Sequence, residues 1–162
     1  MNKKILRIVM AACLAAFTCL STMISVPLAF GYVHVGDALV LLCGYLLGPL
    51  YGFLAAALGS ALADLLLGYV IYAPLTFFLK GGMACLIALI VLRKTKRAAL
   101  LSSFLGAVLA ELLMAAGYFV FETLLYGVGG ALSTLPMNLL QGGITLCIAP
   151  LLFSLLPKRK LP

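Results

Sequence analysis

Long apolar stretches, separated by short polar bends and by clusters of Lys and Arg, account for most of this sequence. A helix needs about 20 apolar residues to cross the hydrocarbon core of a bilayer. The 162 residues therefore provide for six crossings with short connections and leave no room for a separate soluble domain. A mean hydropathy of +1.26 and a charged fraction of 9% exclude an ordinary water-soluble domain. We predict one all-α integral membrane domain over residues 1–162, built as a bundle of six transmembrane helices.

The residues that interrupt the apolar runs place the expected helices. Proline lacks a backbone N–H and restricts the preceding residue, so Gly48-Pro49 predicts a break inside a long apolar run, and a Gly-rich bend at 127–130 predicts another. The helix before Gly48 is only about 20 Å long by helical rise, which is short for a crossing. Residues 36–68 therefore either cross twice or form a buried re-entrant hairpin. The approximate helix bounds are 5–27, 36–48, 50–67, 75–92, 98–122 and 133–156.

The basic residues predict the orientation in the membrane. Ten of the eleven Lys and Arg residues lie near the N-terminus, in the cluster at 93–97, or near the C-terminus. These three places share one side of the membrane if six helices alternate. Short cytoplasmic loops carry the excess of Lys and Arg, so we expect both termini to be cytoplasmic in a multi-pass protein of the bacterial cytoplasmic membrane. No basic face exists away from the spans, so we expect no nucleic acid as a partner.

The cysteines and the single histidine do not form a metal-binding pattern. All five cysteines lie within apolar segments, without a C-x-x-C pair, and a free thiol packs there as a small apolar side chain. The sequence also contains no Walker motif of the form Gly-x-x-x-x-Gly-Lys-Ser/Thr. We therefore expect no metal, no cofactor and no ATP hydrolysis by this chain, and we expect it not to be an enzyme.

Lys80 is the one basic residue inside an expected helix. It lies about 9 Å beyond Pro74 by helical rise, and an ionised side chain near the middle of a bilayer costs on the order of 2.5–3.5 kcal/mol on insertion scales. We therefore expect a carboxylate partner, and alternation of the helices places Asp37 and Asp64 in the same leaflet. A pair of Lys80 with Asp64 would either fix helix packing or contact a ligand, and the sequence leaves both open.

Polar residues in the last two expected helices are spaced to share helix faces. They form two groups, with intervals of seven and four, then of three and four: Glu111, Tyr118 and Glu122, followed by Asn138, Gln141 and Thr145. Polar groups in hydrocarbon need partners, so both faces should point into the bundle. Because these residues and the aromatic bends converge at one depth, we expect a cavity in the outward half of the bundle.

The expected cavity has the character of a small-molecule site. Tyr side chains would stack on a flat, neutral or weakly charged heteroaromatic ligand, and amide and hydroxyl groups would bind its polar edge. The inward half shows no comparable polar path, which argues against a continuous pore. The candidate substrate-binding residues are His34, Asp37, Asp64, Tyr69, Tyr72, Thr76, Lys80, Glu111, Tyr118, Asn138 and Gln141.

Four stretches in the middle of the chain form a recognisable series. They are HVGDA at residues 34–38, GPLYG at 48–52, GSALADLLLGY at 59–69 and YAPLTFFLKG at 72–81. Over these roughly fifty residues the sequence resembles the substrate-binding S components of energy-coupling factor (ECF) transporters, in the riboflavin-type branch. The last two helices agree with this family in hydropathy and in the placement of charge.

The resemblance implies a high-affinity vitamin-binding subunit with six membrane helices and no ATPase of its own. It also implies partners in the bilayer and beneath it: a transmembrane coupling subunit and two ATP-binding cassette subunits that drive uptake. In this family an A-x-x-x-A pattern on the first helix meets the coupling subunit, and here the pattern occurs twice, in Ala11 with Ala15 and in Ala12 with Ala16. Related members are assigned to different vitamins, and we rank pyridoxine or the hydroxymethylpyrimidine precursor of thiamin ahead of riboflavin.

Two other classes of protein remain as alternatives. An integral membrane enzyme would use Asp37, Asp64, His34 and Glu111 for acid-base or metal chemistry, but one histidine and no paired-carboxylate motif are a poor set for it. A scaffold or small channel would use the Gly- and Ala-rich faces for helix packing alone. Equilibrium binding of labelled vitamins distinguishes the three, because only an S component binds tightly without turnover.

Overall fold

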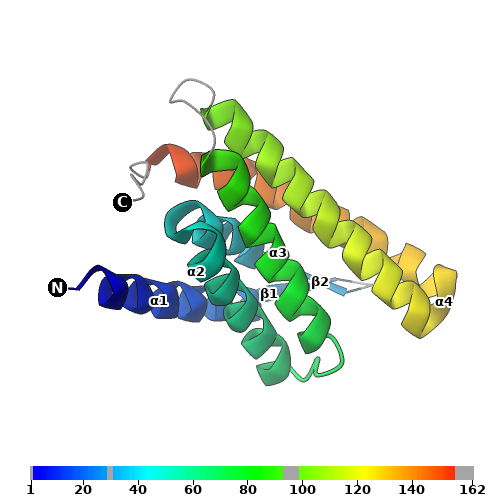
Figure 1. Cartoon of the computed structure of the whole chain (residues 1–162). Coiled ribbons are helices and arrows are strands. Elements are labelled where there is room, and N and C mark those ends of the chain that lie inside the picture. The colour runs from blue at the N-terminus through cyan, green and yellow to red at the C-terminus, as the bar shows by residue number, and fades with distance from the viewer. Residues whose placement is uncertain (1, 29–30, 93–98, 156–162) are drawn as a thin grey trace.

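The computed structural model of the protein describes residues 2–28, 31–92 and 99–155. Within these residues the chain forms four α-helices and one two-stranded antiparallel hairpin (Figure 1). In chain order they are α1 (Lys3–Met23), β1 (Ser25–Leu28), β2 (Gly31–His34), α2 (Gly36–Leu66), α3 (Ala73–Leu92) and α4 (Ala99–Leu155). By length and composition, each helix is able to cross a membrane.

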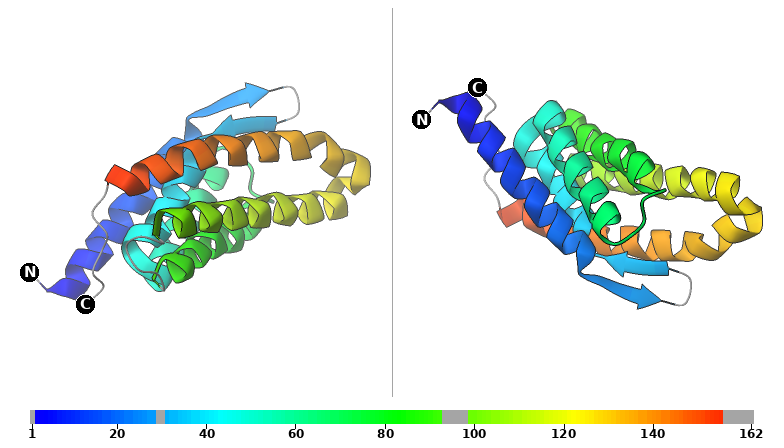
Figure 2. Two further views of the ribbon diagram at one scale, coloured as in Figure 1. Left: turned by 90° about the horizontal axis from the view of Figure 1, so that it is seen from above. Right: turned by 90° about the horizontal axis from the view of Figure 1, so that it is seen from below.

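The expectation of six separate helices is wrong for the part of the chain that the structure describes, which contains four. The second and third expected helices lie within α2, and the fifth and sixth lie within α4, and in each element two helical segments meet directly at one residue with non-helical backbone angles. Each bends sharply at a single glycine, Gly48 (φ 80°, ψ −175°) in α2 and Gly127 (φ 76°, ψ 171°) in α4. Glycine adopts a positive φ without steric strain, so a single residue redirects the chain at each of the two places where the sequence predicted a break, Gly48-Pro49 and the bend at 127–130. We call the segments of α4 before and after Gly127 its first and second arms. Figure 2 shows the two arms, yellow-green and orange, folded side by side.

A β-hairpin replaces much of the polar bend between the first two helices. Helix α1 ends at Met23, before the expected end at residue 27, and β1 pairs antiparallel with β2, with Ser25 opposite His34. Proline has no N–H to donate within a helix, which explains why the helix does not continue through Pro27. The fold is therefore all-α apart from this hairpin, whose second strand contacts α4.

Close contacts between small residues join α2 to α1 on one side and to α3 on the other. A methyl group built on Gly44 would overlap the carbonyl oxygen of Ala84 in α3, and one built on Gly59 would overlap the carbonyl oxygen of Ala15 in α1. Small residues let membrane helices approach this closely. The apolar core between the helices includes Leu41, Met83, Ile87 and Met114.

One end of the bundle gathers most of the helix ends. The start of α1, the end of α3 and both ends of α4 lie there (Figures 1 and 2). This arrangement agrees with the expectation that the basic segments share one side of the membrane. The basic residues at 93–97 and 158–160 lie outside the described residues, and the cytoplasmic assignment of this side stays a prediction.

Candidate functional site

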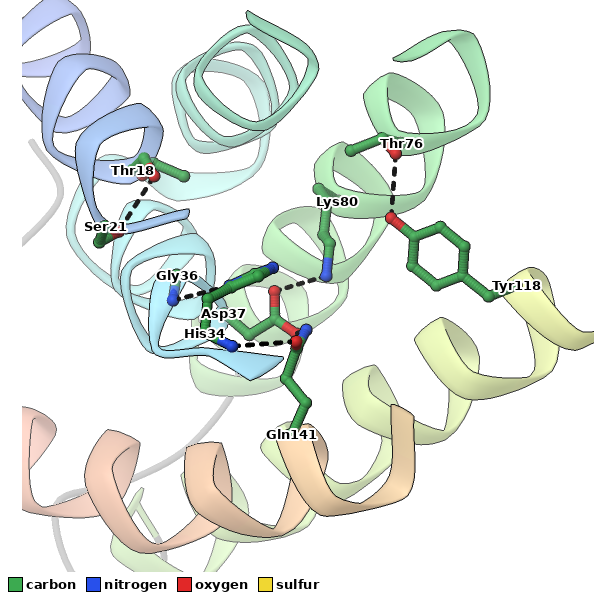
Figure 3. Close-up of polar contacts among 9 residues, drawn as sticks. All are labelled: Thr18, Ser21, His34, Gly36, Asp37, Thr76, Lys80, Tyr118 and Gln141. Atoms are coloured by element: carbon green, nitrogen blue, oxygen red, sulfur yellow. Dashed lines mark hydrogen bonds and ion pairs between the residues drawn. The ribbon is translucent and has the colours of Figure 1, made fainter. Parts of the chain in front are cut away.

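A buried ion pair lies at the centre of the polar residues. Lys80 Nζ of α3 lies 2.5 Å from Asp37 Oδ1, in the first turn of α2 (Figure 3). The two residues are 2% and 0% exposed. Of the two expected carboxylate candidates, Asp37 forms the ion pair with Lys80, and Asp64 forms none with it but is still attracted by its charge.

The second oxygen of Asp37 joins this pair to α4 and to the hairpin. Gln141 Nε2 donates to Asp37 Oδ2 at 2.7 Å, and the backbone N–H of His34 donates to Gln141 Oε1 at 3.4 Å. The Gly36 N–H donates to His34 Nδ1 at 3.1 Å (Figure 3). Buried charges are tolerated when their remaining hydrogen-bonding capacity is satisfied, so this network fixes three helices and β2 relative to one another.

His34 contributes no positive charge to the site at neutral pH. Burial lowers the pKa of its imidazole from 6.5 to about 4, because the charged form loses its hydration, and nearby Lys80 lowers the pKa further while Asp37 opposes the shift. The neutral ring is the form that accepts the Gly36 hydrogen bond at Nδ1. His34 therefore acts as a hydrogen-bonding group at the edge of the cavity.

Tyr118, in the first arm of α4, connects Lys80 to the first turn of α3. Its hydroxyl shares a hydrogen bond of 2.9 Å with Thr76 Oγ1 (Figure 3). Lys80 Nζ lies 5.5 Å from the centroid of the Tyr118 ring, a distance typical of a cation–π contact. The ammonium group of Lys80 is thus enclosed by a carboxylate and an aromatic ring.

Glu122 joins both arms of α4 to the turn before α3. Its Oε1 accepts a hydrogen bond of 3.5 Å from the Tyr72 hydroxyl, and its Oε2 accepts one from the Thr134 hydroxyl. The Glu122 residue is buried. A carboxylate that accepts hydrogen bonds from two hydroxyl groups is held in a fixed orientation at this end of the site.

These side chains surround a cavity of about 170 Å³. Its lining residues come from β2, the C-terminal end of α2, the turn that follows, α3 and both arms of α4: His34, Asp64, Tyr69, Tyr72, Lys80, Tyr118, Glu122, Thr134, Met137, Asn138 and Gln141. Eight of the eleven predicted site residues are in this lining. The other three are Asp37 and Thr76, which hydrogen-bond to lining residues, and Glu111.

Glu111 differs from the other predicted residues. It is buried in the first arm of α4, and neither of its carboxyl oxygens has a hydrogen-bond partner among the described residues. A methyl group built on Gly142, in the second arm, would lie 3.3 Å from Glu111 Cβ. Glu111 therefore faces the second arm of α4, and it is not among the residues that line the cavity.

Three lining residues were not among the sequence candidates: Glu122, Thr134 and Met137. Glu122 follows Tyr118 by four residues, and Thr134 and Met137 precede Asn138 and Gln141 by four. Residues four apart lie on the same face of a helix, so the helical spacing was sufficient to include all three. Thr134 and Met137 lie inside the helix expected at 133–156, and they were left out because its polar face was defined by Asn138, Gln141 and Thr145 alone.

Two polar atoms on the cavity wall have no hydrogen-bond partner among the described residues: Asp64 Oδ2 and Asn138 Nδ2. Asp64 is 4% exposed. Buried polar groups are rarely left unpaired, because each costs about 1–3 kcal/mol in desolvation. Both residues line the cavity, so an unsatisfied acceptor and an unsatisfied donor lie within its wall. No group of three or more His, Cys, Asp or Glu side chains arranged to hold a metal ion occurs within the described ranges.

Three of the four alanines expected to meet a partner, all except Ala16, border a separate apolar groove of about 240 Å³. Its walls are one face of α1 and one face of α2, with Ala11, Ala12 and Ala15 on the first and Tyr51 and Leu54 among those on the second. Ala12 and Ala16 are exposed, whereas Ala11 and Ala15 are half-buried against α2. Of the two A-x-x-x-A pairs, the pair at 12 and 16 is therefore the more accessible.

Three comparisons relate the chain to known proteins. A model of the family described as "ECF-type riboflavin transporter, S component" matches residues 2–158. A protein of Pyrococcus woesei, described as an uncharacterized protein in gap 3'region, is 34% identical over 136 residues, which cover 84% of this chain and 89% of that protein. A solved structure of the S component of a bacterial ECF transporter has a TM-score of 0.69 at 19% identity, and the match covers 94% of this chain and 95% of that one. The last similarity shows a shared fold.

Proposed function

We propose that this chain, which belongs to the family of ECF-type riboflavin transporter S components, captures a small heteroaromatic vitamin or vitamin precursor in the cavity lined by Asp64 and Asn138. It is an integral membrane protein, and its family is a class of transporter subunits rather than of enzymes. Partner subunits then drive uptake of the bound molecule. The unpartnered atoms Asp64 Oδ2 and Asn138 Nδ2, both in an aromatic cavity, carry this proposal.

The size of the cavity favours a ligand with a single ring. Sites for drug-sized ligands have volumes of about 300–1,000 Å³, and the space here is about 170 Å³. Pyridoxine and hydroxymethylpyrimidine each have one six-membered ring with short polar substituents, whereas riboflavin has three fused rings and a long polyol chain. We therefore rank the one-ring vitamers first and keep riboflavin, which the family's description names, as the second candidate.

The polar residues divide into two roles. The group of Asp37, Lys80 and Gln141, joined by hydrogen bonds of 2.5 and 2.7 Å, positions the walls of the cavity. The aromatic rings of Tyr69 and Tyr72 and the polar atoms of the unpartnered residues contact the ligand. Ring stacking gives affinity for a flat molecule, and the polar atoms select the substituents at its edge.

Docking to a transmembrane coupling subunit occurs at the groove beside α1. A partner helix lies across the exposed pair Ala12 and Ala16, where small side chains permit close approach. Two ATP-binding cassette subunits then act through the coupling subunit, because this chain has no Walker motif. The groove and the cavity have no lining residue in common, so one chain is able to hold the ligand and the partner together.

Native mass spectrometry of the gently purified chain, followed by equilibrium binding, tests ligand capture. We expect one small molecule per chain, and we expect one of pyridoxine, hydroxymethylpyrimidine, thiamin or riboflavin to bind tightly and be recovered unchanged. Turnover of the bound molecule would instead support a membrane enzyme. Absence of any bound vitamin would favour a packing scaffold and would overturn the proposal.

Co-purification with the coupling subunit tests docking. Replacing Ala12 and Ala16 by Leu places bulk on the accessible pair, and we expect the complex to be lost while vitamin binding is retained. Cys13→Leu is the matched control, because Cys13 is exposed on the same helix at a different angular position. An intact complex with both alanines replaced would contradict this docking surface.

A further inference from the structure

We propose that the ligand binds as a cation, through an ammonium group or a positively charged ring nitrogen on a one-ring heteroaromatic molecule, and that Asp64 is the carboxylate that faces this charge. The inference rests on the proposed function and narrows its ligand class. It departs from the neutral or weakly charged ligand that the sequence suggests, because the structure reveals how the charges of the site are paired.

The positive charge of the protein in this region is already neutralised. Lys80, the one cation in the lining, is paired with Asp37 at 2.5 Å and lies over the Tyr118 ring. His34 adds no charge near neutral pH, because burial holds its pKa at about 4. The protein therefore has no unpaired cation among the lining residues with which to bind an anionic ligand.

The lining also contains two carboxyl groups that form no ion pair within the described residues, although Lys80 attracts Asp64 at longer range and Thr76 hydrogen-bonds to it. Asp64 is 4% exposed, lines the cavity, and its Oδ2 has no hydrogen-bond partner among the described residues. Glu122 lines the same cavity and accepts hydrogen bonds from the hydroxyl groups of Tyr72 and Thr134, which orient it without neutralising its charge. The site is thus rich in acceptors, and Asp64 offers the unsatisfied one.

The aromatic rings of the cavity are suited to a positively charged ligand. Tyr72 lies with its ring centroid 6.3 Å from that of Tyr69 and 6.4 Å from that of Tyr118, and all three residues line the cavity. The negative face of an aromatic ring attracts a cation, and clusters of rings are a common means of binding ammonium groups. Rings together with one unpaired carboxylate therefore favour a cation over a neutral molecule of the same shape.

The carboxylate of Asp64 contributes more than the aromatic rings to the expected preference for a cation. An unpaired charge that is removed from water is strongly unfavourable, and a bound cation relieves this cost. A neutral ligand adds no charge to the partial compensation that Thr76 and Lys80 give Asp64. A hydrogen bond to a charged group contributes about 1.5–3 kcal/mol, so we expect a preference of roughly 10- to 100-fold for the cation.

Two pairs of probes test this preference, each pair differing only in an aminomethyl group, charged at neutral pH, and a hydroxymethyl group. The first pair is pyridoxamine and pyridoxine. The second is 5-aminomethyl- and 5-hydroxymethyl-4-amino-2-methylpyrimidine. Isothermal titration calorimetry of the full chain in lipid nanodiscs at pH 7 should show that the charged member of at least one pair binds at least tenfold more tightly.

Asp64→Asn identifies the residue responsible. We expect the preference to fall to within about threefold, because the amide keeps the shape and an acceptor oxygen for either probe and removes the charge that favours only the cationic member. The neutral probe serves as the control for folding and for access to the cavity. Glu122→Gln should reduce the preference less, because both of its oxygens already accept hydrogen bonds.

The remaining outcomes would overturn the inference. Equal or tighter binding of the neutral member in the pair that binds excludes a cationic ligand, and a preference that survives Asp64→Asn excludes Asp64 as its partner. Binding of none of the four probes also overturns the inference. In that case riboflavin, or another molecule found bound to the purified chain, would still support the proposed function, so the two failures are distinguishable.

Discussion

Two regions of this bundle are held together by different physical means. The polar cluster, formed by His34, Asp37, Lys80 and Gln141, joins its elements through a few directed contacts between buried groups. The small-residue seam, at Gly44 and Gly59 of α2, joins its helices mainly through close approach to the backbone of the neighbouring helices. Close packing tolerates a change in side-chain chemistry but not an added side-chain volume. The polar cluster tolerates a change in volume but not the loss of a charge or a hydrogen bond. The cavity lies beside the polar cluster, so binding depends on the region whose chemistry is fixed.

The largest effect is expected from removing one charge of the polar cluster. Lys80→Met leaves Asp37 buried without its cation, and breaking a buried pair in this way costs about 3–5 kcal/mol. We expect a correspondingly large loss in the free energy of unfolding of the chain in detergent. A loss below about 1 kcal/mol would mean that the pair does not hold the site together.

The matched control for this change removes both charges. Replacing Asp37 by Asn and Lys80 by Met in one chain leaves no uncompensated charge, so the double variant should be more stable than Lys80→Met alone. Additive losses would indicate that the two side chains do not interact. This comparison also separates structure from binding, because the double variant retains the lining atoms of Asp64 and Asn138.

A pH dependence of about 3 kcal/mol is expected from His34. Its pKa is about 4 in the folded chain and about 6.5 when unfolded, so between these values the unfolded chain binds more protons. The free energy of unfolding contributed by His34 is therefore fully present above about pH 6.5 and is lost as the pH falls toward 4. His34→Asn should remove this contribution, measured as the difference between the two proteins across that window. Identical pH profiles would contradict a buried, neutral His34.

A smaller effect is expected from the small-residue seam. A methyl group at Gly44 meets the carbonyl oxygen of Ala84, so Gly44→Ala forces α2 and α3 apart and should lower the free energy of unfolding by about 1–3 kcal/mol. Vitamin affinity of the folded protein should change by less than about threefold. Gly129→Ala is the control, because a methyl group there meets no atom within 4 Å, and it should be neutral or slightly stabilising. Equal losses in the two variants would refute the seam.

The smallest effect is expected where the polar cluster meets the cavity wall. Tyr118→Phe removes the hydrogen bond of 2.9 Å to Thr76 and keeps the ring over Lys80. One such bond contributes about 0.5–1.5 kcal/mol, so we expect a decrease of that size in the free energy of unfolding. Vitamin binding by the variant, measured by titration calorimetry, should weaken by less than about tenfold. A larger loss would mean that the hydroxyl itself contacts the ligand.

Helical spacing and the placement of charge predicted the membrane character and most of the cavity lining. Tyr118, Asn138 and Gln141 were found because polar residues in apolar helices must face inward, a rule that depends only on local periodicity. The same rule extends to Glu122 and Thr134. The motif order in residues 34–81 indicated the resemblance to ECF S components, and the family match over residues 2–158 confirms it.

The details that depend on three-dimensional approach were not predictable from the pattern. Sequence spacing places Asp37 and Asp64 at one depth but does not say which of them reaches Lys80. The sequence predicted breaks at Gly48-Pro49 and at 127–130, but it did not predict that one residue with a positive φ would directly join the two helical segments at each place. The hairpin of β1 and β2 is stabilised by contact with α4, which is distant in sequence.

Binding of a vitamin to the wild-type chain and to Asn138→Leu, measured by titration calorimetry in nanodiscs, tests the central claim most directly. The probe is whichever of pyridoxine, hydroxymethylpyrimidine, thiamin and riboflavin binds the wild-type chain most tightly. We expect one site per chain and an affinity at least tenfold weaker in the variant, because Asn138 lines the cavity and its Nδ2 has no hydrogen-bond partner among the described residues. Unchanged affinity in a folded variant, or no binding of any of the four by the wild-type chain, would contradict capture in this cavity.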